Sequence, residues 1–235
     1  METGSPLILL VDDDPVVRMI TRQTLTRAGY TVQEAMHGRA AQARLEEAVP
    51  ALILLDVLMP EMVGFEFCVW LRGQPDWTRV PVLMMTGLDD NDSIQRAFEV
   101  GATDFVVKPV NPSILIQRVR FLLRASQTLE DLAKNRESLA TAQRIARLGS
   151  WNADFTKQKL TWSEEVFRIL EIDSERYRPS YDLYLTRVHP EDREHVRQSF
   201  SASRQQGKSY DIAHRLLMPD GREKWVNERG GHILG

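Results

Sequence analysis

Five short apolar runs mark the first half of the chain, and four of them end in a polar side chain. The runs at residues 7–11, 51–55, 80–85 and 104–107 lead into Asp12, Asp56, Thr86 and Lys108, whereas the run at 30–32 passes into Gln33 and Glu34. Continuous apolar runs of this length are typical of buried parallel strands. The pattern therefore predicts a parallel sheet that carries chemical groups at most of its strand ends.

Helical periodicity fills the segments between these runs. The pair Asp14-Pro15 is typical of a helix N-cap followed by proline at the first helical position, and Asn111-Pro112 repeats that start. Apolar residues at helical spacing predict further helices at 38–48, 65–71 and 91–100. Because strands that alternate with helices indicate βαβ units, the first half is predicted to be an α/β domain.

The helix that begins after Asn111 continues past the point where a compact domain would end it. Neither Gly nor Pro interrupts the chain between Pro112 and Gly149, and apolar residues recur sparsely among charged ones. Sparse heptads of this kind fit a helix that pairs with its copy in a coiled-coil dimer, and they also fit a solvated helical linker. We assign residues 125–147 to a helical linker, for which both interpretations stay open.

From Gly149 onward the pattern changes, and three of the five tryptophans lie in this second half. Short strands are predicted at 151–155 and 160–162, helices after Ser163 and after Pro190, and longer strands at 209–218 and 223–233 around Pro219-Asp220-Gly221. A Pro-Asp-Gly triplet between alternating segments is a hairpin signal. The second half is therefore predicted to be a separate α+β domain with an antiparallel sheet.

The composition is that of an ordinary soluble protein. The 235 residues are 43% hydrophobic and 27% charged, which allows one or two domains with sizeable cores. A net charge of −3 gives no reason to expect binding to nucleic acid by bulk attraction. Cys68 is the only cysteine, so no intrachain disulfide can form, and neither a signal peptide nor a membrane-spanning run is visible. A cytoplasmic location is expected.

The strand ends carry the candidate chemistry. Open α/β sheets bind ligands at the carboxyl ends of their strands, so Asp12, Asp13, Asp56, Thr86 and Lys108 are expected to converge there. Crowded carboxylates repel one another and need a cation to stay ionised, and a set of oxygen ligands suits Mg²⁺. A carboxylate can also attack phosphorus, and phosphoryl transfer needs positive charge on the phosphoryl oxygens.

These requirements give each residue a predicted role. Asp12 and Asp13 would hold the metal, and Asp56 would accept a phosphoryl group. Lys108 would supply the counter-charge and Thr86 a hydroxyl donor. Asp14, by contrast, is expected to serve only as the N-cap of the first helix.

Residues 5–124 resemble the receiver domain of the response regulators of two-component signalling. The resemblance rests on separated motifs in the right order, namely Leu9-Leu10-Val11-Asp12-Asp13, Leu54-Leu55-Asp56-Val57-Leu58-Met59-Pro60 with Gly64-Phe65-Glu66, Met85-Thr86-Gly87, and Gly101-Ala102-Thr103-Asp104-Phe105-Val106-Val107-Lys108-Pro109. It implies a flavodoxin-like, doubly wound sheet of five parallel strands.

The resemblance also implies a phosphoacceptor and its metal ligands. Asp56 would take its phosphoryl group from the phosphohistidine of a partner, either a sensor histidine kinase or a phosphotransfer protein. Asp13, Asp56 and the backbone carbonyl of Leu58 would help to coordinate Mg²⁺. Asp12 would act on the metal largely through water.

A switch is implied as well. Thr86 would turn toward the phosphoryl group, and Phe105 would move inward with it, while the Lys108–Pro109 peptide bond is expected to be cis. Two apolar residues depart from common receivers, Leu58 and Leu88, which lie two positions after Asp56 and Thr86. We hypothesise that both flank the phosphoryl group, restrict the attacking water and lengthen the life of the phosphorylated state.

Residues 148–235 resemble a PAS domain of the type that ends in a PAC motif. The motifs are Ala146-Arg147-Leu148-Gly149-Ser150-Trp151, Trp162-Ser163 before Val166-Phe167, Val188-His189-Pro190-Glu191-Asp192-Arg193, and His214-Arg215 through Pro219-Asp220-Gly221 to Trp225-Val226. The last strand of the family has no counterpart after Gly235, so we expect the chain to be a fragment of a longer protein.

The sequence does not identify a ligand for this second domain, and the domain could function without one. Cys68 lies outside it, which argues against a flavin–cysteine adduct. The histidines of this half have no second metal or haem ligand at a recognisable spacing; they are His189, His195, His214 and His232. Its tryptophans are more typical of a core than of a cofactor site.

The leading hypothesis is a response regulator, a phosphorylation-gated switch that signals through the linker helix of a homodimer to the PAS domain. It is a signalling protein rather than an enzyme, with no contact to nucleic acid or membrane expected. The alternative is the regulatory fragment of a cyclic-dinucleotide cyclase or phosphodiesterase whose catalytic domain is absent. A hybrid histidine kinase is disfavoured because the helix at 111–147 contains no histidine. A DNA-binding output is disfavoured because no helix-turn-helix signal follows the receiver.

Overall fold

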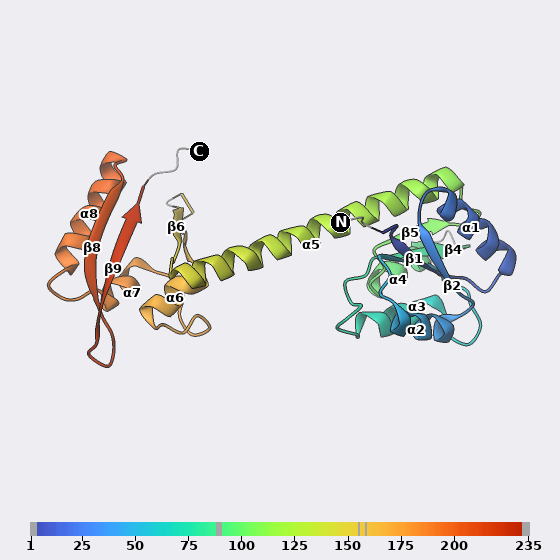
Figure 1. The fold of residues 1–235 in the computed structure, drawn as a ribbon, viewed down its shortest axis with the longest axis horizontal. Coiled ribbons are helices and arrows are strands. Elements are labelled where there is room, and N and C mark those ends of the chain that lie inside the picture. The colour runs from blue at the N-terminus through green and yellow to red at the C-terminus, as the bar shows by residue number, and fades with distance from the viewer. Residues whose placement is uncertain (1–3, 88–90, 155, 158, 232–235) are drawn as a thin grey trace. The chain divides into compact units, whose positions relative to one another are not determined.

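The computed structural model describes residues 4–87, 91–154, 156–157 and 159–231 (Figure 1). The chain divides into two compact units, with the division after Leu132. That point lies inside the segment 125–147 that we assigned to a linker. Across the described residues, no helix has the length and apolar character that crossing a membrane requires.

The first unit is a doubly wound α/β domain, as predicted. Its strands are β1 (Leu7–Val11), β2 (Thr31–Ala35), β3 (Leu52–Asp56), β4 (Val82–Thr86) and β5 (Asp104–Val107), and its helices are α1 (Pro15–Arg27), α2 (Gly38–Glu47), α3 (Gly64–Arg72), α4 (Asn91–Glu99) and the beginning of α5 (Pro112–Ala146). All neighbouring strands are parallel and follow the order β2-β1-β3-β4-β5. The strand order reverses between β1 and β3, which is where open sheets of this kind bind ligands.

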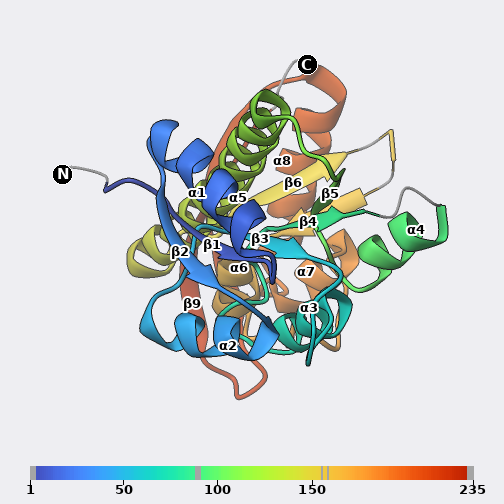
Figure 2. The same cartoon turned by 90° about the vertical axis from the view of Figure 1, so that its right-hand side faces the viewer.

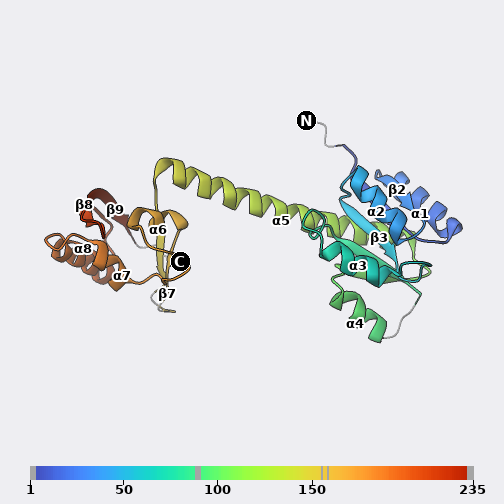
Figure 3. The same cartoon turned by 90° about the horizontal axis from the view of Figure 1, so that it is seen from below.

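Side chains that alternate along each strand fill two separate cores. In β1, Leu9 and Val11 pack into the core that α2 and α3 cover, whereas Ile8 and Leu10 pack into the core of α1 and α5. Figures 1 and 3 show α2 and α3 side by side on one face of the sheet, and Figure 2 shows helices on both faces. Because both faces are buried, the central strands are apolar without interruption.

Three connections shape the end of the sheet where the candidate residues lie. Asp14 caps α1, since its side chain accepts hydrogen bonds from the amides of Val16 at 2.8 Å and Val17 at 3.2 Å. After β3, the chain loops out and returns at Gly64, whose amide donates to the carbonyl of Val57 at 2.9 Å. The expected cis peptide bond between Lys108 and Pro109 is present.

Helix α5 is 35 residues long and changes character along its length. Its first turns bury Leu115, Val119 and Leu122 against the sheet. Further along, the helix leaves apolar side chains exposed to solvent; among them are Leu129, Leu132 and Leu139. The uninterrupted helix follows from the absence of Gly and Pro in this segment.

The second unit is α+β with antiparallel strand pairs, as predicted. It contains the end of α5, then β6 (Trp151–Asp154), β7 (Lys159–Trp162), α6 (Glu164–Leu170), α7 (Tyr181–Arg187), α8 (Arg193–Gln206), β8 (Tyr210–Leu217) and β9 (Glu223–Gly230). Strands β6 and β7 form one antiparallel pair, and β8 and β9 form another. Figure 3 shows α7 and α8 beside the β8–β9 hairpin. Sequence reasoning missed the short helix α7.

Candidate functional site

Four strand ends of the first unit bring the predicted residues together. Asp12 follows β1, Asp56 ends β3, Thr86 ends β4 and Lys108 follows β5. The ammonium nitrogen Nζ of Lys108 lies 2.7 Å from Oδ2 of Asp12 and 2.9 Å from Oδ1 of Asp56. Parallel strands in register present their carboxyl ends at one edge, so residues up to 96 positions apart in the chain meet there.

Burial disfavours the charged forms of the side chains in this cluster. Asp12 has no exposed surface and Asp56 only 5%, whereas Asp13 is exposed. Burial raises the pKa of Asp56, because a carboxylate loses its hydration there. The hydrogen bond and positive charge of Lys108 act in the opposite direction and favour the ionised carboxylate.

The same contacts keep Lys108 charged. Burial alone would lower the pKa of its ammonium group. The hydrogen bonds and charges of Asp12 and Asp56 outweigh that effect, and the pKa of Lys108 is raised. One lysine is thus shared between two buried carboxylates.

The donor set fits a hard divalent cation. Asp12, Asp13 and Asp56 each offer a carboxylate oxygen, and these three atoms lie within 4.8 Å of one another. Oxygen-only ligands at this density suit Mg²⁺, which usually takes one or two carboxylates and retains waters. Across the part of the chain that the structure describes, no other cluster of His, Cys, Asp or Glu meets the same criterion.

Asp14 lies beside this cluster in sequence, but its side chain is used to cap α1. Its backbone amide donates to Oδ1 of Asp12 at 3.0 Å, which closes the turn between β1 and α1. Sequence reasoning missed a further participant: Arg18 of α1 donates to the backbone carbonyls of both Asp12 and Asp13. In the sequence, the only signal for this contact is an arginine one turn after the N-cap residue Asp14.

The predicted switch residues lie on β4 and β5. Thr86 is buried at the end of β4. Phe105 is half-buried, and its ring packs edge to face against Phe98 of α4, with centroids 5.7 Å apart and an interplanar angle of 82°. Leu58 has 57% of its surface exposed, and Leu88 lies outside the described residues.

A polar network lies inside the second unit. The hydroxyl of Tyr184 donates to Oε2 of Glu228 at 2.6 Å and lies 2.7 Å from Nε2 of His214. Because that hydroxyl proton goes to the carboxylate, Nε2 of His214 must carry the other proton, and Tyr210 donates to the second oxygen of Glu228 at 2.7 Å. His214 is buried, and this burial lowers its pKa, which favours the neutral form of the imidazole.

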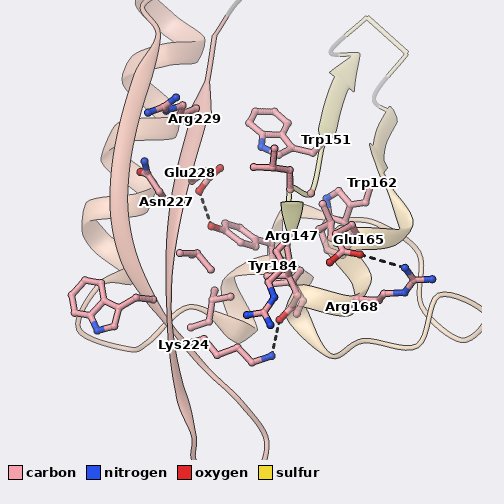
Figure 4. A pocket seen from close by; sticks show the side chains of 18 of the residues that line it. Arg147, Trp151, Trp162, Glu165, Arg168, Tyr184, Lys224, Asn227, Glu228 and Arg229 are labelled. Atoms are coloured by element: carbon pink, nitrogen blue, oxygen red, sulfur yellow. Dashed lines mark hydrogen bonds and ion pairs between the residues drawn. The ribbon is translucent and has the colours of Figure 1, made fainter. Parts of the chain in front are cut away.

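A groove of about 1100 Å³ adjoins this network, with walls from the end of α5 and from β6, β7, α6, α7, α8, β8 and β9 (Figure 4). Six consecutive residues of β9, 224–229, line it. Successive side chains of a strand point to opposite faces, so a space that touches six in a row runs along the edge of the strand. This shape differs from that of an enclosed ligand pocket. His189 and His195 lie outside its lining, and His232 lies beyond the described residues.

Comparisons with known proteins agree with both halves of the chain. The family model of the response regulator receiver domain matches residues 8–120, and the model of the PAS fold matches residues 159–233. The chain is 34% identical over 171 residues to the probable transcriptional regulator ycf27 of Cyanophora paradoxa. The aligned residues cover 72% of this chain and 67% of that protein.

Two further relatives cover the first half. The DNA-binding dual master transcriptional regulator RpaA of Synechocystis is 37% identical over 57% of this chain and 56% of its own length. The structure of a CheY-like receiver domain protein from Methanospirillum hungatei is 27% identical, covers 53% of this chain and 98% of that one, and has a TM-score of 0.50.

The chain thus spans about half to two thirds of the length of these curated relatives. The two curated relatives are named as regulators of transcription, so the comparisons do not favour the cyclase or phosphodiesterase alternative. The same family is indicated by the receiver motifs, by the five-stranded doubly wound sheet with its acidic edge and by the two matching family models. The chain belongs to the response regulators of two-component signalling, with a receiver domain followed by a PAS fold.

Proposed function

We propose that this chain is a phosphorylation-gated switch in which Asp56 accepts a phosphoryl group from the phosphohistidine of a sensor histidine kinase or phosphotransfer protein. One observation carries the proposal: Asp56 is a buried carboxylate that Lys108 contacts at 2.9 Å, with two further aspartates close by. A structural ion pair would need only one of these three carboxylates.

The transfer step requires an ionised Asp56. A carboxylate oxygen of Asp56 forms the new P–O bond, the P–N bond to the histidine breaks, and its electron pair leaves with the imidazole nitrogen. Lys108 favours the charged nucleophile before the step. Once the carboxylate has become an acyl phosphate, the lysine is free to follow the negative charge onto a phosphoryl oxygen.

Asp13, Asp56 and the backbone carbonyl of Leu58 would hold Mg²⁺, with Asp12 acting largely through water. When bound, the metal supplies positive charge that stabilises the developing charge on the phosphoryl oxygens. The support for this assignment is the oxygen-only donor set and its spacing. Both oxygens of Asp12 already accept hydrogen bonds, Oδ2 from Lys108 and Oδ1 from the amide of Asp14, which favours an indirect role for Asp12.

Thr86 would then bind the phosphoryl group, and Phe105 would move inward in response. The edge-to-face contact between Phe105 and Phe98 of α4 is the one that such a movement would break. The change would reach α4 and the following helix α5, which continues toward the PAS domain. We further propose that two cytoplasmic copies pair through the exposed leucines of α5 and that the paired helices carry the signal.

Intact-mass spectrometry after incubation with Mg²⁺ and acetyl phosphate tests the proposal. The wild type should gain one phosphoryl group, and Asp56→Asn should gain none. Asp14→Asn is the matched control, because asparagine caps a helix as well as aspartate does and Asp14 lies outside the proposed site. A wild type that stays unmodified, or a modified Asp56→Asn, would contradict the assignment.

A further inference from the structure

Arg18 reaches back from α1 to the acidic turn at the end of β1. Its Nη1 atom donates to the backbone carbonyl oxygen of Asp12 at 2.6 Å and to that of Asp13 at 2.9 Å. The guanidinium group therefore binds the main chain of both aspartates. No ion pair of Arg18 with a carboxylate is found among the residues that the structure describes.

These two bonds fix the geometry of the turn. A peptide group is planar, so a bond to the carbonyl oxygen of Asp12 orients the plane that leads to Asp13, and the second bond orients the next plane. The amide of Asp14 adds a third restraint through Oδ1 of Asp12 at 3.0 Å. Asp13 is exposed, and among the described residues no side chain forms a hydrogen bond or ion pair with its carboxylate, so its direction depends on this backbone.

We propose that Arg18 is a positioning residue for the cation site, which holds the turn so that the carboxylates of Asp12 and Asp13 converge with that of Asp56. The inference rests on the proposed function, since it concerns the same Mg²⁺. Arg18 would act through its hydrogen bonds to backbone carbonyls, whereas Lys108 contacts the carboxylates directly.

Charge and positioning predict opposite results when Arg18 is removed. Loss of a positive charge near three carboxylates would, by Coulomb attraction alone, tighten the binding of a cation. Loss of the two backbone bonds would let the turn relax and would weaken binding. Groups that do not touch the metal but orient its ligands through hydrogen bonds typically contribute roughly 10–100-fold to metal affinity.

Calorimetric titration of the whole chain with Mg²⁺ distinguishes these cases. Arg18→Ala should bind Mg²⁺ at least about 10-fold more weakly than the wild type. Arg22→Ala is the matched control: it lies one turn further along α1, carries the same charge and makes only a surface contact with Glu34 at 3.6 Å, so its affinity should match the wild type. Arg18→Met, which keeps the aliphatic stem, replaces Arg18→Ala if thermal melting in EDTA shows that the alanine variant is unfolded.

A metal-free readout accompanies the titration. Amide hydrogen exchange at Asp14, measured by NMR in EDTA, should be faster in Arg18→Ala than in Arg22→Ala, because the turn has lost its restraint. Unchanged exchange at Asp14, or Mg²⁺ binding as tight as in the wild type or tighter, would overturn the role of Arg18. A wild type that binds no Mg²⁺ would instead refute the metal part of the proposed function, and the inference would fall with it.

Discussion

The ammonium nitrogen of Lys108 lies 2.9 Å from Oδ1 of Asp56 and joins the residue after β5 to the end of β3. The same nitrogen also contacts Asp12, whose side chain has no exposed surface. The ion pair is therefore part of a buried set of charges, in which removing one member leaves the others uncompensated.

Lys108→Ala should destabilise the metal-free receiver domain by about 3 kcal/mol, because two buried carboxylates lose their counter-charge. Urea denaturation in EDTA measures this loss, and added Mg²⁺ should restore more stability to the variant than to the wild type. Arg118→Ala, which breaks the exposed pair with Asp104, should cost at most about 1 kcal/mol. Equal losses in the two variants would contradict the central position of Lys108.

Gly64→Ala should abolish phosphorylation of Asp56 by acetyl phosphate. A Cβ atom at Gly64 would lie 2.2 Å from the carbonyl oxygen of Asp56 and 2.9 Å from Cα of Val57, so the backbone next to the acceptor must move. In Gly87→Ala, a Cβ atom would meet no atom of the described residues within 4 Å, and phosphorylation should persist. Intact-mass spectrometry compares the two, and a Gly64→Ala variant as reactive as the wild type would refute the prediction.

Leu58→Asn should speed the loss of the phosphoryl group several-fold. We hypothesise that the exposed apolar side chain of Leu58, two residues after the proposed acceptor, would hinder the attacking water, whereas an amide would bind it. The decay of the phosphorylated mass after removal of the donor gives the rate, alone and combined with Leu88→Asn. Val69→Asn, an equally exposed position on α3, is the control, and a half-life unchanged by both replacements would end the hypothesis.

The PAS unit should lose stability as the pH falls below about 6.5, the ordinary pKa of histidine. Burial lowers the pKa of His214 and outweighs the opposing charges of Glu228 and Asp192, and its buried Nδ1 has no hydrogen-bond partner among the described residues. As the pH falls, His214 is therefore protonated in the unfolded chain before it is protonated in the folded one. The stability present above pH 6.5 declines until the pH reaches the pKa of His214 in the folded chain.

Chemical denaturation at pH 7 and pH 5 measures this loss, and His214→Gln should reduce the difference between the two. His195→Gln is the comparison: His195 lies on α8 outside the network with Tyr184, and its charge is the last-named cause of the lowered pKa of His214, so this variant should keep most of the pH dependence. A pH dependence that is the same in His214→Gln and the wild type would show that another group is responsible.

Leu132→Lys combined with Leu139→Lys should weaken the proposed dimer at least about 10-fold, because a coiled-coil seam does not tolerate charges at two successive d positions. Both leucines are exposed and lie seven residues apart on α5. Ile145 is more exposed than either but lies off this seam, so Ile145→Lys should leave the association unchanged. Sedimentation equilibrium measures all three, and a monomeric wild type would refute the pairing.

The sequence predicted the strand ends and their chemical groups because continuous apolar runs and the residue that follows each are local signals. Asp12, Asp56, Thr86 and Lys108 lie where those runs implied. Arg18 and the network of Tyr184, His214 and Glu228 were out of reach, since each depends on contacts between elements. Helix α7 was missed because seven residues carry little periodicity.

If Asp56 is the acceptor, its 5% exposure would restrict which phosphoryl donors can reach it. A flat protein surface would not bring a phosphorus atom to a carboxylate that is this little exposed. A phosphohistidine that projects from its own helix can reach it, and so can a molecule as small as acetyl phosphate. The burial of Asp56 would therefore select among protein donors by their shape, before any specific contact between the partners is made.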